Sequence, residues 1–182
     1  AVDPLFATMD ALGHKQAVLV GNSSGAAIAL EAARLEPQRV EGLVLINPLA
    51  IAGRTTLPGW LAQTPQLQRL SLLAARWFGR STALLERSYH DASRISAERR
   101  AQALVHTEIA GWDLAWGALF ERSLTTPLAV GEALATVMTA TLVVIGEADR
   151  VIAPERSWQV AETLANARGI ALAGCGHVAQ EE

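Results

Sequence analysis

Short apolar runs that end in turn residues constrain the fold of this chain more than any other feature. Two of them, Ala17–Val20 and Gly42–Ile46, flank Gly25–Leu35, where apolar and small residues recur at helical spacing. Such continuous runs are typical of strands buried on both faces of a parallel sheet. A helix between two of them provides the crossover that parallel strands require. This part of the sequence predicts a strand-helix-strand unit, with another helix before it over Pro4–His14.

The same pattern returns near the end of the chain. Thr141–Gly146 is a third clear buried-strand run, Pro154–Ala165 has helical spacing, and Gly169–Ala173 is a weaker strand. The two parts together predict an α/β fold with a parallel sheet of about four strands flanked by helices.

The middle of the chain has a different character, because no buried-strand run occurs there and apolar residues recur every three or four positions. The predicted helical segments are Trp60–Leu61, Leu67–Phe78, Thr82–Tyr89, Ser96–Ile109 and Leu114–Leu124. We therefore expect an α/β core formed by residues 1–47 and 138–182, and a helical insertion over residues 48–137.

Composition excludes several classes of protein. The 182 residues are 51% apolar and 18% charged with a net charge of -3, which favours a folded chain without the basic patch of a nucleic-acid-binding protein. No apolar run reaches the roughly 18 residues of a membrane span. Cys175 is the single cysteine, so no intrachain disulfide forms and a cytoplasmic location is the simpler expectation. We expect no metal and no cofactor, because the sequence lacks both the spacing of a zinc helix and a phosphate-binding loop.

A possible nucleophile lies between the first predicted strand and its helix. Gly21-Asn22-Ser23-Ser24-Gly25 matches G-x-S-x-G, in which a sharp turn exposes the serine hydroxyl and the glycines allow close packing. The Ser24 N–H, at the start of the helix, could stabilise an oxyanion. The alternative is a tight turn in which Ser23 only caps the helix.

Two later motifs also follow predicted strands. Asp149 lies in Gly146-Glu147-Ala148-Asp149-Arg150, and His177 ends Gly174-Cys175-Gly176-His177. The carboxyl ends of parallel strands are where such sheets bind ligands. Taken singly, each could be an ordinary loop residue. Together they give the chain order Ser, Asp, His.

These three motifs together resemble those of the α/β-hydrolase superfamily with a helical cap. The resemblance implies that Ser23 is the nucleophile, Asp149 the acid and His177 the base of an acyl-enzyme mechanism. It implies no cofactor and a small-molecule substrate, either an apolar ester or the carbon-carbon bond of a ring-cleavage product. A capped binding protein with an unused triad is the alternative from another class. Candidate substrate contacts are Asn22, Trp60, Trp77, Trp112, Trp116 and Val151, although for any single tryptophan a place in the core of the insertion is the favoured interpretation.

The resemblance covers only part of the superfamily's sheet. Its members have about eight strands, and the motif around Ser23 follows the fifth, so we expect the chain to be a fragment without the first four strands and the second oxyanion N–H. The strand over Ala17–Val20 would then present an unpaired apolar edge, through which the chain could self-associate.

Overall fold

The predicted parallel sheet is present in the computed structural model, which describes residues 2–50, 58–125 and 133–182. Its four strands lie in the order β1-β2-β3-β4, and all neighbours are parallel. Their bounds are Ala17–Asn22 for β1, Val40–Ile46 for β2, Thr141–Gly146 for β3 and Ala167–Leu172 for β4. Each predicted strand is therefore confirmed, with bounds that shift by at most two residues.

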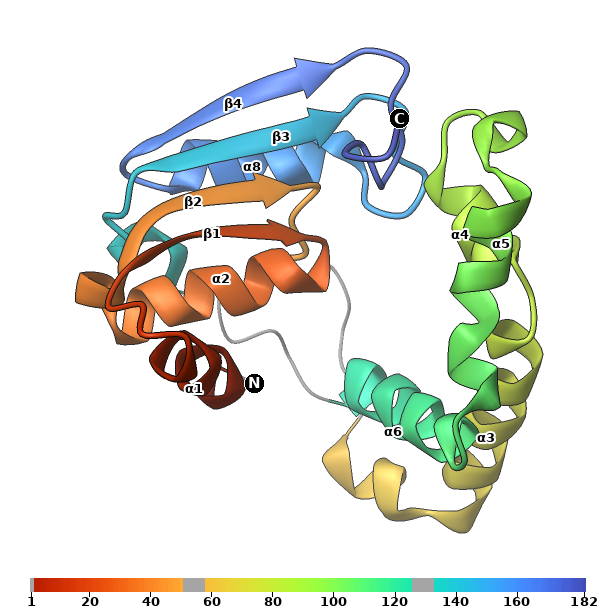
Figure 1. The fold of residues 1–182 in the computed structure, drawn as a ribbon. Helices are drawn as coiled ribbons and strands as arrows, with labels where there is room; N and C mark the ends of the chain where they lie inside the picture. Colours follow the sequence, from red (N-terminus) through yellow and green to blue (C-terminus); the bar gives the residue numbers. More distant parts are fainter. Residues whose placement is uncertain (1, 51–57, 126–132) are drawn as a thin grey trace. The chain divides into compact units, whose positions relative to one another are not determined.

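Two helices cover one face of this sheet. Helix α2, Ser24–Leu35, lies along β1 and β2, and helix α8, Pro154–Thr163, lies along β3 and β4 on the same side (Figure 1). Helix α1, Asp3–Ala11, adds Phe6 and Met9 to the same core. The strand residues in that core include Leu19, Leu43, Leu45, Val143 and Ile145. Burying these side chains supplies the main driving force for the α/β unit, at about 25 cal/mol per Å² of apolar surface.

The residues that alternate with these on β1 point to the opposite face of the sheet. Val18 and Val20 are 53% and 67% exposed. Strand β1 is also an edge strand of the four-stranded sheet. An exposed edge that carries large apolar side chains is a ready surface for pairing with another strand.

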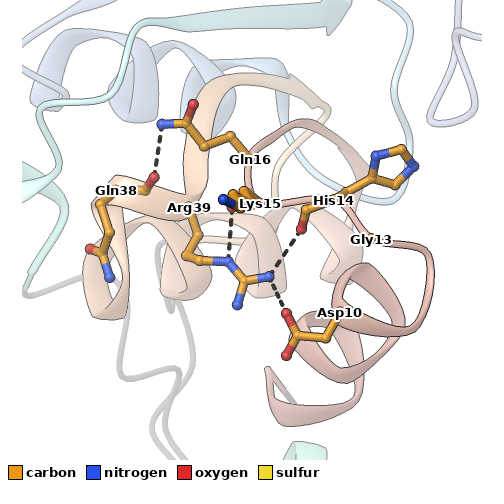
Figure 2. Close-up of a pocket in the computed structure, with 7 residues that line it drawn as sticks. All are labelled: Asp10, Gly13, His14, Lys15, Gln16, Gln38 and Arg39. Carbon is orange, nitrogen blue, oxygen red and sulfur yellow. Dashed lines mark hydrogen bonds and ion pairs between the residues drawn. The ribbon is translucent and has the colours of Figure 1, made fainter.

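At the amino ends of β1 and β2, Arg39 joins the loop after α1 to the sheet. Its guanidinium donates to the main-chain oxygens of Lys15 and His14 at 3.0 and 3.2 Å, and to Asp10 Oδ1 at 2.6 Å. It also lies 5.2 Å from the centre of the Phe6 ring. A cavity of about 610 Å³ opens beside these groups (Figure 2). Because several partners hold the guanidinium, we interpret this region as a structural contact between Arg39 and the segment that leads from α1 to β1.

The described residues in the middle of the chain, 58–125, form helices joined by short connections. Two helices pack together through small residues: α3, Pro65–Gly79, buries Ser71 and Ala75, and α6, Trp112–Thr125, brings Gly117 against the α3 backbone near Leu72. The other α-helices among the described residues of this region are α4, Ala83–Ser88, and α5, Ala97–Leu104. Short 3₁₀ helices span Pro37–Arg39, Gly59–Gln63, Ala92–Arg94, Val105–Glu108 and Leu134–Thr136.

Two details of the helical prediction differ from the structure. The helix predicted over Ser96–Ile109 ends at Leu104 and continues as a 3₁₀ helix to Glu108. Trp60–Leu61 lies in a 3₁₀ helix rather than an α-helix. Both segments are short, and apolar spacing alone does not separate three from 3.6 residues per turn.

The chain divides into two compact units. We call the first the sheet unit; the second is the helical unit. The sheet unit comprises Ala1–Ala52, Ser88–His90 and Leu128–Glu182, and the helical unit comprises Gly53–Arg87 and Asp91–Pro127. The sheet unit thus includes Ser88–His90, which lies inside the predicted insertion. In the described ranges, none of the helices combines the length and apolar character needed to cross a membrane.

Candidate active site

Ser23 occupies a strained position between β1 and α2. Its backbone has φ 55° and ψ -118°, a conformation that residues other than glycine rarely adopt. The Ser23 N–H donates to the Ile46 carbonyl at 3.0 Å, and its carbonyl accepts from the N–H groups of Ala26 and Leu49. Because strain of this kind persists only where surrounding contacts hold it, it is often found at functional sites.

The two glycines of this turn have different roles. A Cβ atom on Gly21 would lie 2.5 Å from the carbonyl carbon and oxygen of Gly25, so only glycine allows the strand and helix to approach this closely. A Cβ on Gly25 would meet no atom within 4 Å. The expectation that both glycines serve close packing therefore holds for Gly21, and the contact at Gly25 involves its backbone alone.

Asp149 and His177 form a buried pair at the carboxyl ends of β3 and β4. The distance between His177 Nδ1 and Asp149 Oδ2 is 2.7 Å, and both residues are buried. The second carboxylate oxygen of Asp149 accepts from the N–H groups of Val151 and Ile152 at 2.7 and 2.9 Å. The carboxylate is thus fixed through both oxygens, and it orients the imidazole with Nε2 as the ring nitrogen left for another proton partner.

The backbone of His177 is fixed independently of its ring. Its N–H donates to the Ser88 carbonyl at 2.7 Å, and its carbonyl accepts from Asn22 Nδ2 and Asn47 Nδ2, each at 2.9 Å. Asn22 directly precedes Ser23, so this bond joins the end of β1 to the loop that contains Gly174–His177, which we call the histidine loop. Among the described residues, no hydrogen bond links the Ser23 hydroxyl to the His177 ring. Such bonds are often long without substrate and tighten when it binds.

Other residues that hold the histidine loop were not predicted from the sequence. Glu182 accepts from the Gly176 N–H at 2.5 Å and from the His90 N–H at 3.0 Å. Tyr89 donates its hydroxyl proton to Glu181 at 2.5 Å. A sequence pattern does not reveal these contacts, because about ninety residues separate Tyr89 and His90 from their partners.

The candidate substrate contacts fall into two groups. In the sheet unit, the Asn22 amide is already engaged by Ile46 O and His177 O, whereas the Val151 side chain is exposed. Ser24 is the first residue of α2, and its N–H therefore lies in the first turn, where such groups have no acceptor within the helix.

The second group lies in the helical unit. Trp112 and Trp116 both contact His106, each with ring centroids 5.2 Å apart, which favours a core role for them. Trp60 and Trp77 are largely exposed. Ring contacts through Phe78 and Phe120 join Trp77 to Trp116.

No group of three or more metal-ligating side chains comes together in the portions of the chain that the structure describes. The groups that this site offers for chemistry are the serine, the buried Asp149–His177 pair and backbone N–H donors.

A serine held at positive φ between a parallel strand and a helix, with a buried Asp–His pair at the ends of later strands, is the arrangement of a hydrolase-type α/β protein. A family model described as alpha/beta hydrolase fold matches residues 2–182. The chain belongs to this family. The predicted fold family is therefore confirmed.

Relatives and solved structures agree with this assignment. The chain is 30% identical, over 193 residues, to a 2-hydroxymuconate semialdehyde hydrolase of Pseudomonas putida, with 100% of this chain and 63% of the relative covered. A second relative of the same name, from Pseudomonas sp. strain CF600, is also 30% identical, with 62% of its length covered. The chain thus spans less than two thirds of these relatives.

Among solved structures, a 2-hydroxy-6-oxo-6-phenylhexa-2,4-dienoate hydrolase from Rhodococcus sp. strain RHA1 is similar with a TM-score of 0.76 and 23% identity, over 100% of this chain and 64% of that one. The meta-cleavage product hydrolase CumD of Pseudomonas fluorescens IP01 is similar with a TM-score of 0.73 and 24% identity, over 97% and 63%. At sequence identities below 25%, this structural similarity shows a shared fold and nothing more specific.

Proposed function

We propose that this protein is a serine hydrolase in which Ser23, His177 and Asp149 act together on a small carbonyl compound. The observation that carries the proposal is the buried His177–Asp149 pair at 2.7 Å, in the same sheet unit as a serine at φ 55°. A buried carboxylate that fixes the imidazole is what a general base needs in order to accept a proton from a serine hydroxyl.

The proposed reaction has two stages. His177 Nε2 removes the proton of Ser23 Oγ as the oxygen attacks the substrate carbonyl carbon, and Asp149 stabilises the imidazolium that forms. The Ser24 N–H donates to the developing oxyanion. The bond to the leaving group then breaks as His177 returns the proton to that group. Water, activated by the same histidine, releases the acyl group from Ser23.

For the substrate, we propose the class named by the curated relatives, a 2-hydroxymuconate semialdehyde or a similar ring-cleavage product, whose carbon-carbon bond would be hydrolysed. Its support is the 30% identity to two relatives with this name, each matched by the whole of this chain. A small apolar ester is the second candidate, because the same acyl-enzyme chemistry serves both kinds of substrate.

The test combines labelling and turnover. We expect a fluorophosphonate to add to the protein at Ser23, seen by intact mass, and not to the Ser23→Ala variant. We also expect 2-hydroxymuconate semialdehyde to be consumed with a higher kcat/KM than p-nitrophenyl acetate. Faster turnover of the acetate would favour the ester candidate. A folded protein that is neither labelled nor active would contradict the hydrolase proposal and favour a binding role.

A further inference from the structure

Asn47 is a fully buried polar side chain that the reaction above does not use. It follows the last residue of β2, has φ 43°, and none of its surface is exposed. Asparagine is one of the few residues other than glycine that enters this left-handed region readily. A buried amide must be satisfied by hydrogen bonds, and the partners of this one determine what it can do.

The partners of Asn47 lie on two different loops. Its Nδ2 donates to the carbonyl oxygens of Gly176 and His177, both at 2.9 Å. Its Oδ1 accepts from the Gly146 N–H at 2.8 Å. A side-chain amide has two N–H donors, and here both donate to the histidine loop. The amide oxygen accepts from the last residue of β3.

The two loops joined in this way carry the candidate acid and base. Gly146 begins the turn that leads to Asp149, whose N–H donates to the Gly146 carbonyl at 3.2 Å. The loops are also in close contact, because a Cβ on Gly146 would collide with the carbonyl oxygens of Cys175 and Gly176. The relative position of the loops determines the 2.7 Å separation between Asp149 and His177.

We propose that Asn47 is a positioning residue. It holds the turn from Gly146 to Asp149 and the histidine loop together, and thereby keeps His177 aligned for proton transfer. The inference rests on the proposed function for its catalytic consequence. The side-chain hydrogen bonds of Asn47 go to Gly146, Gly176 and His177 backbone atoms, and none of them reaches Ser23 or the imidazole ring. Asn47 acts through the backbone of the two loops.

Asn22 does not duplicate this role. It shares the His177 carbonyl as an acceptor, but its other hydrogen bond is to Ile46 O at 3.1 Å rather than to the turn from Gly146 to Asp149. Among the described side chains, Asn47 alone forms hydrogen bonds with both Gly146 and the Gly176–His177 backbone.

The experiment uses Asn47→Asp, which keeps the shape of the side chain and replaces its two N–H donors with a carboxylate oxygen facing two carbonyl oxygens. Asn166→Asp is the matched control, because it makes the same chemical change at an exposed residue whose side chain has only a 3.5 Å contact with Met138 O. Asn47→Gly is a second variant, which tolerates the positive φ and removes the hydrogen bonds without adding charge.

Two measurements report on the loops. The first is the downfield proton NMR resonance of the His177 Nδ1–H bound to Asp149, assigned by its loss in His177→Gln. The second is the rate of labelling by a fluorophosphonate. We expect Asn47→Asp to shift or broaden the resonance and to slow labelling about 100-fold, the effect of a displacement of about 1 Å in a catalytic geometry. Asn166→Asp should match the unmodified protein in both.

An unchanged resonance and a labelling rate within about threefold of the unmodified protein, in a folded Asn47→Asp protein, would overturn the proposal. If Asn47→Asp does not fold, Asn47→Gly decides by the same criteria. If neither variant folds, the positioning role is rejected and Asn47 is a residue of the fold alone. Failure of the hydrolase proposal is distinguishable, because the unmodified protein would then be unlabelled while the resonance still reports on the loops.

Discussion

Gly21→Ala tests whether the close approach of β1 and α2 depends on the glycine. The new Cβ would lie 2.5 Å from two backbone atoms of Gly25, whereas ordinary contacts begin near 3.4 Å. Because backbone atoms cannot rotate away, the start of α2 must retreat by about 0.9 Å. Overpacking of this kind costs about 1–3 kcal/mol of the free energy of unfolding.

Gly25→Ala is the matched control. Both substitutions remove the flexibility of a glycine from the unfolded chain, which by itself stabilises by roughly 0.5–1 kcal/mol. At Gly25 the added methyl group meets no atom within 4 Å. The difference between the two variants therefore isolates the collision at Gly21.

The assay is thermal unfolding of the two variants and the unmodified protein, followed by circular dichroism. For a chain of this size, about 1–3 kcal/mol corresponds to a difference in Tm of roughly 2–12 °C. We expect Gly21→Ala to melt below the unmodified protein and Gly25→Ala to melt at or above it. A Gly21→Ala protein as stable as Gly25→Ala would refute the reasoning.

Two further predictions concern the charge pair between α3 and α6 and the exposed edge of the sheet. Arg76 Nε donates to Asp113 Oδ2 at 2.9 Å, and this bond holds the pKa of the Asp113 carboxyl below its ordinary value. The pair therefore stabilises the fold above the ordinary aspartate pKa, and the contribution disappears as the pH falls through the lowered pKa. Arg76→Gln should raise the pKa of Asp113 in an NMR titration and leave that of Glu86 low; an unchanged Asp113 pKa would contradict this. We also propose that the chain self-associates through β1. Val20→Lys should then shift sedimentation towards the monomer, and Leu12→Lys, at another exposed position, should not; a monomeric unmodified protein at all concentrations would contradict the proposal.

The loops that carry the candidate residues Asp149 and His177 show what the sequence alone can predict about the site. The strand runs and the order of Ser23, Asp149 and His177 predict that these residues follow strands of one parallel sheet, because carboxyl ends of parallel strands share an edge. The structure adds the 2.7 Å bond between Asp149 and His177 and the strained backbone of Ser23. A loop residue taken alone gives no distance, so the sequence could name the three candidates but could not give their separations.

The sequence by itself determined the class of fold, since strands buried on both faces appear as continuous apolar runs and helices as apolar spacing. Only the tertiary structure showed the hydrogen bonds of the Asn47 side chain, because its partners lie 99 to 130 residues away. The same holds for Ser88–His90, which belongs to the sheet unit although helices of the other unit surround it in sequence. Periodicity reports local environment, whereas a hydrogen bond between distant loops depends on how the whole chain returns to one edge of the sheet.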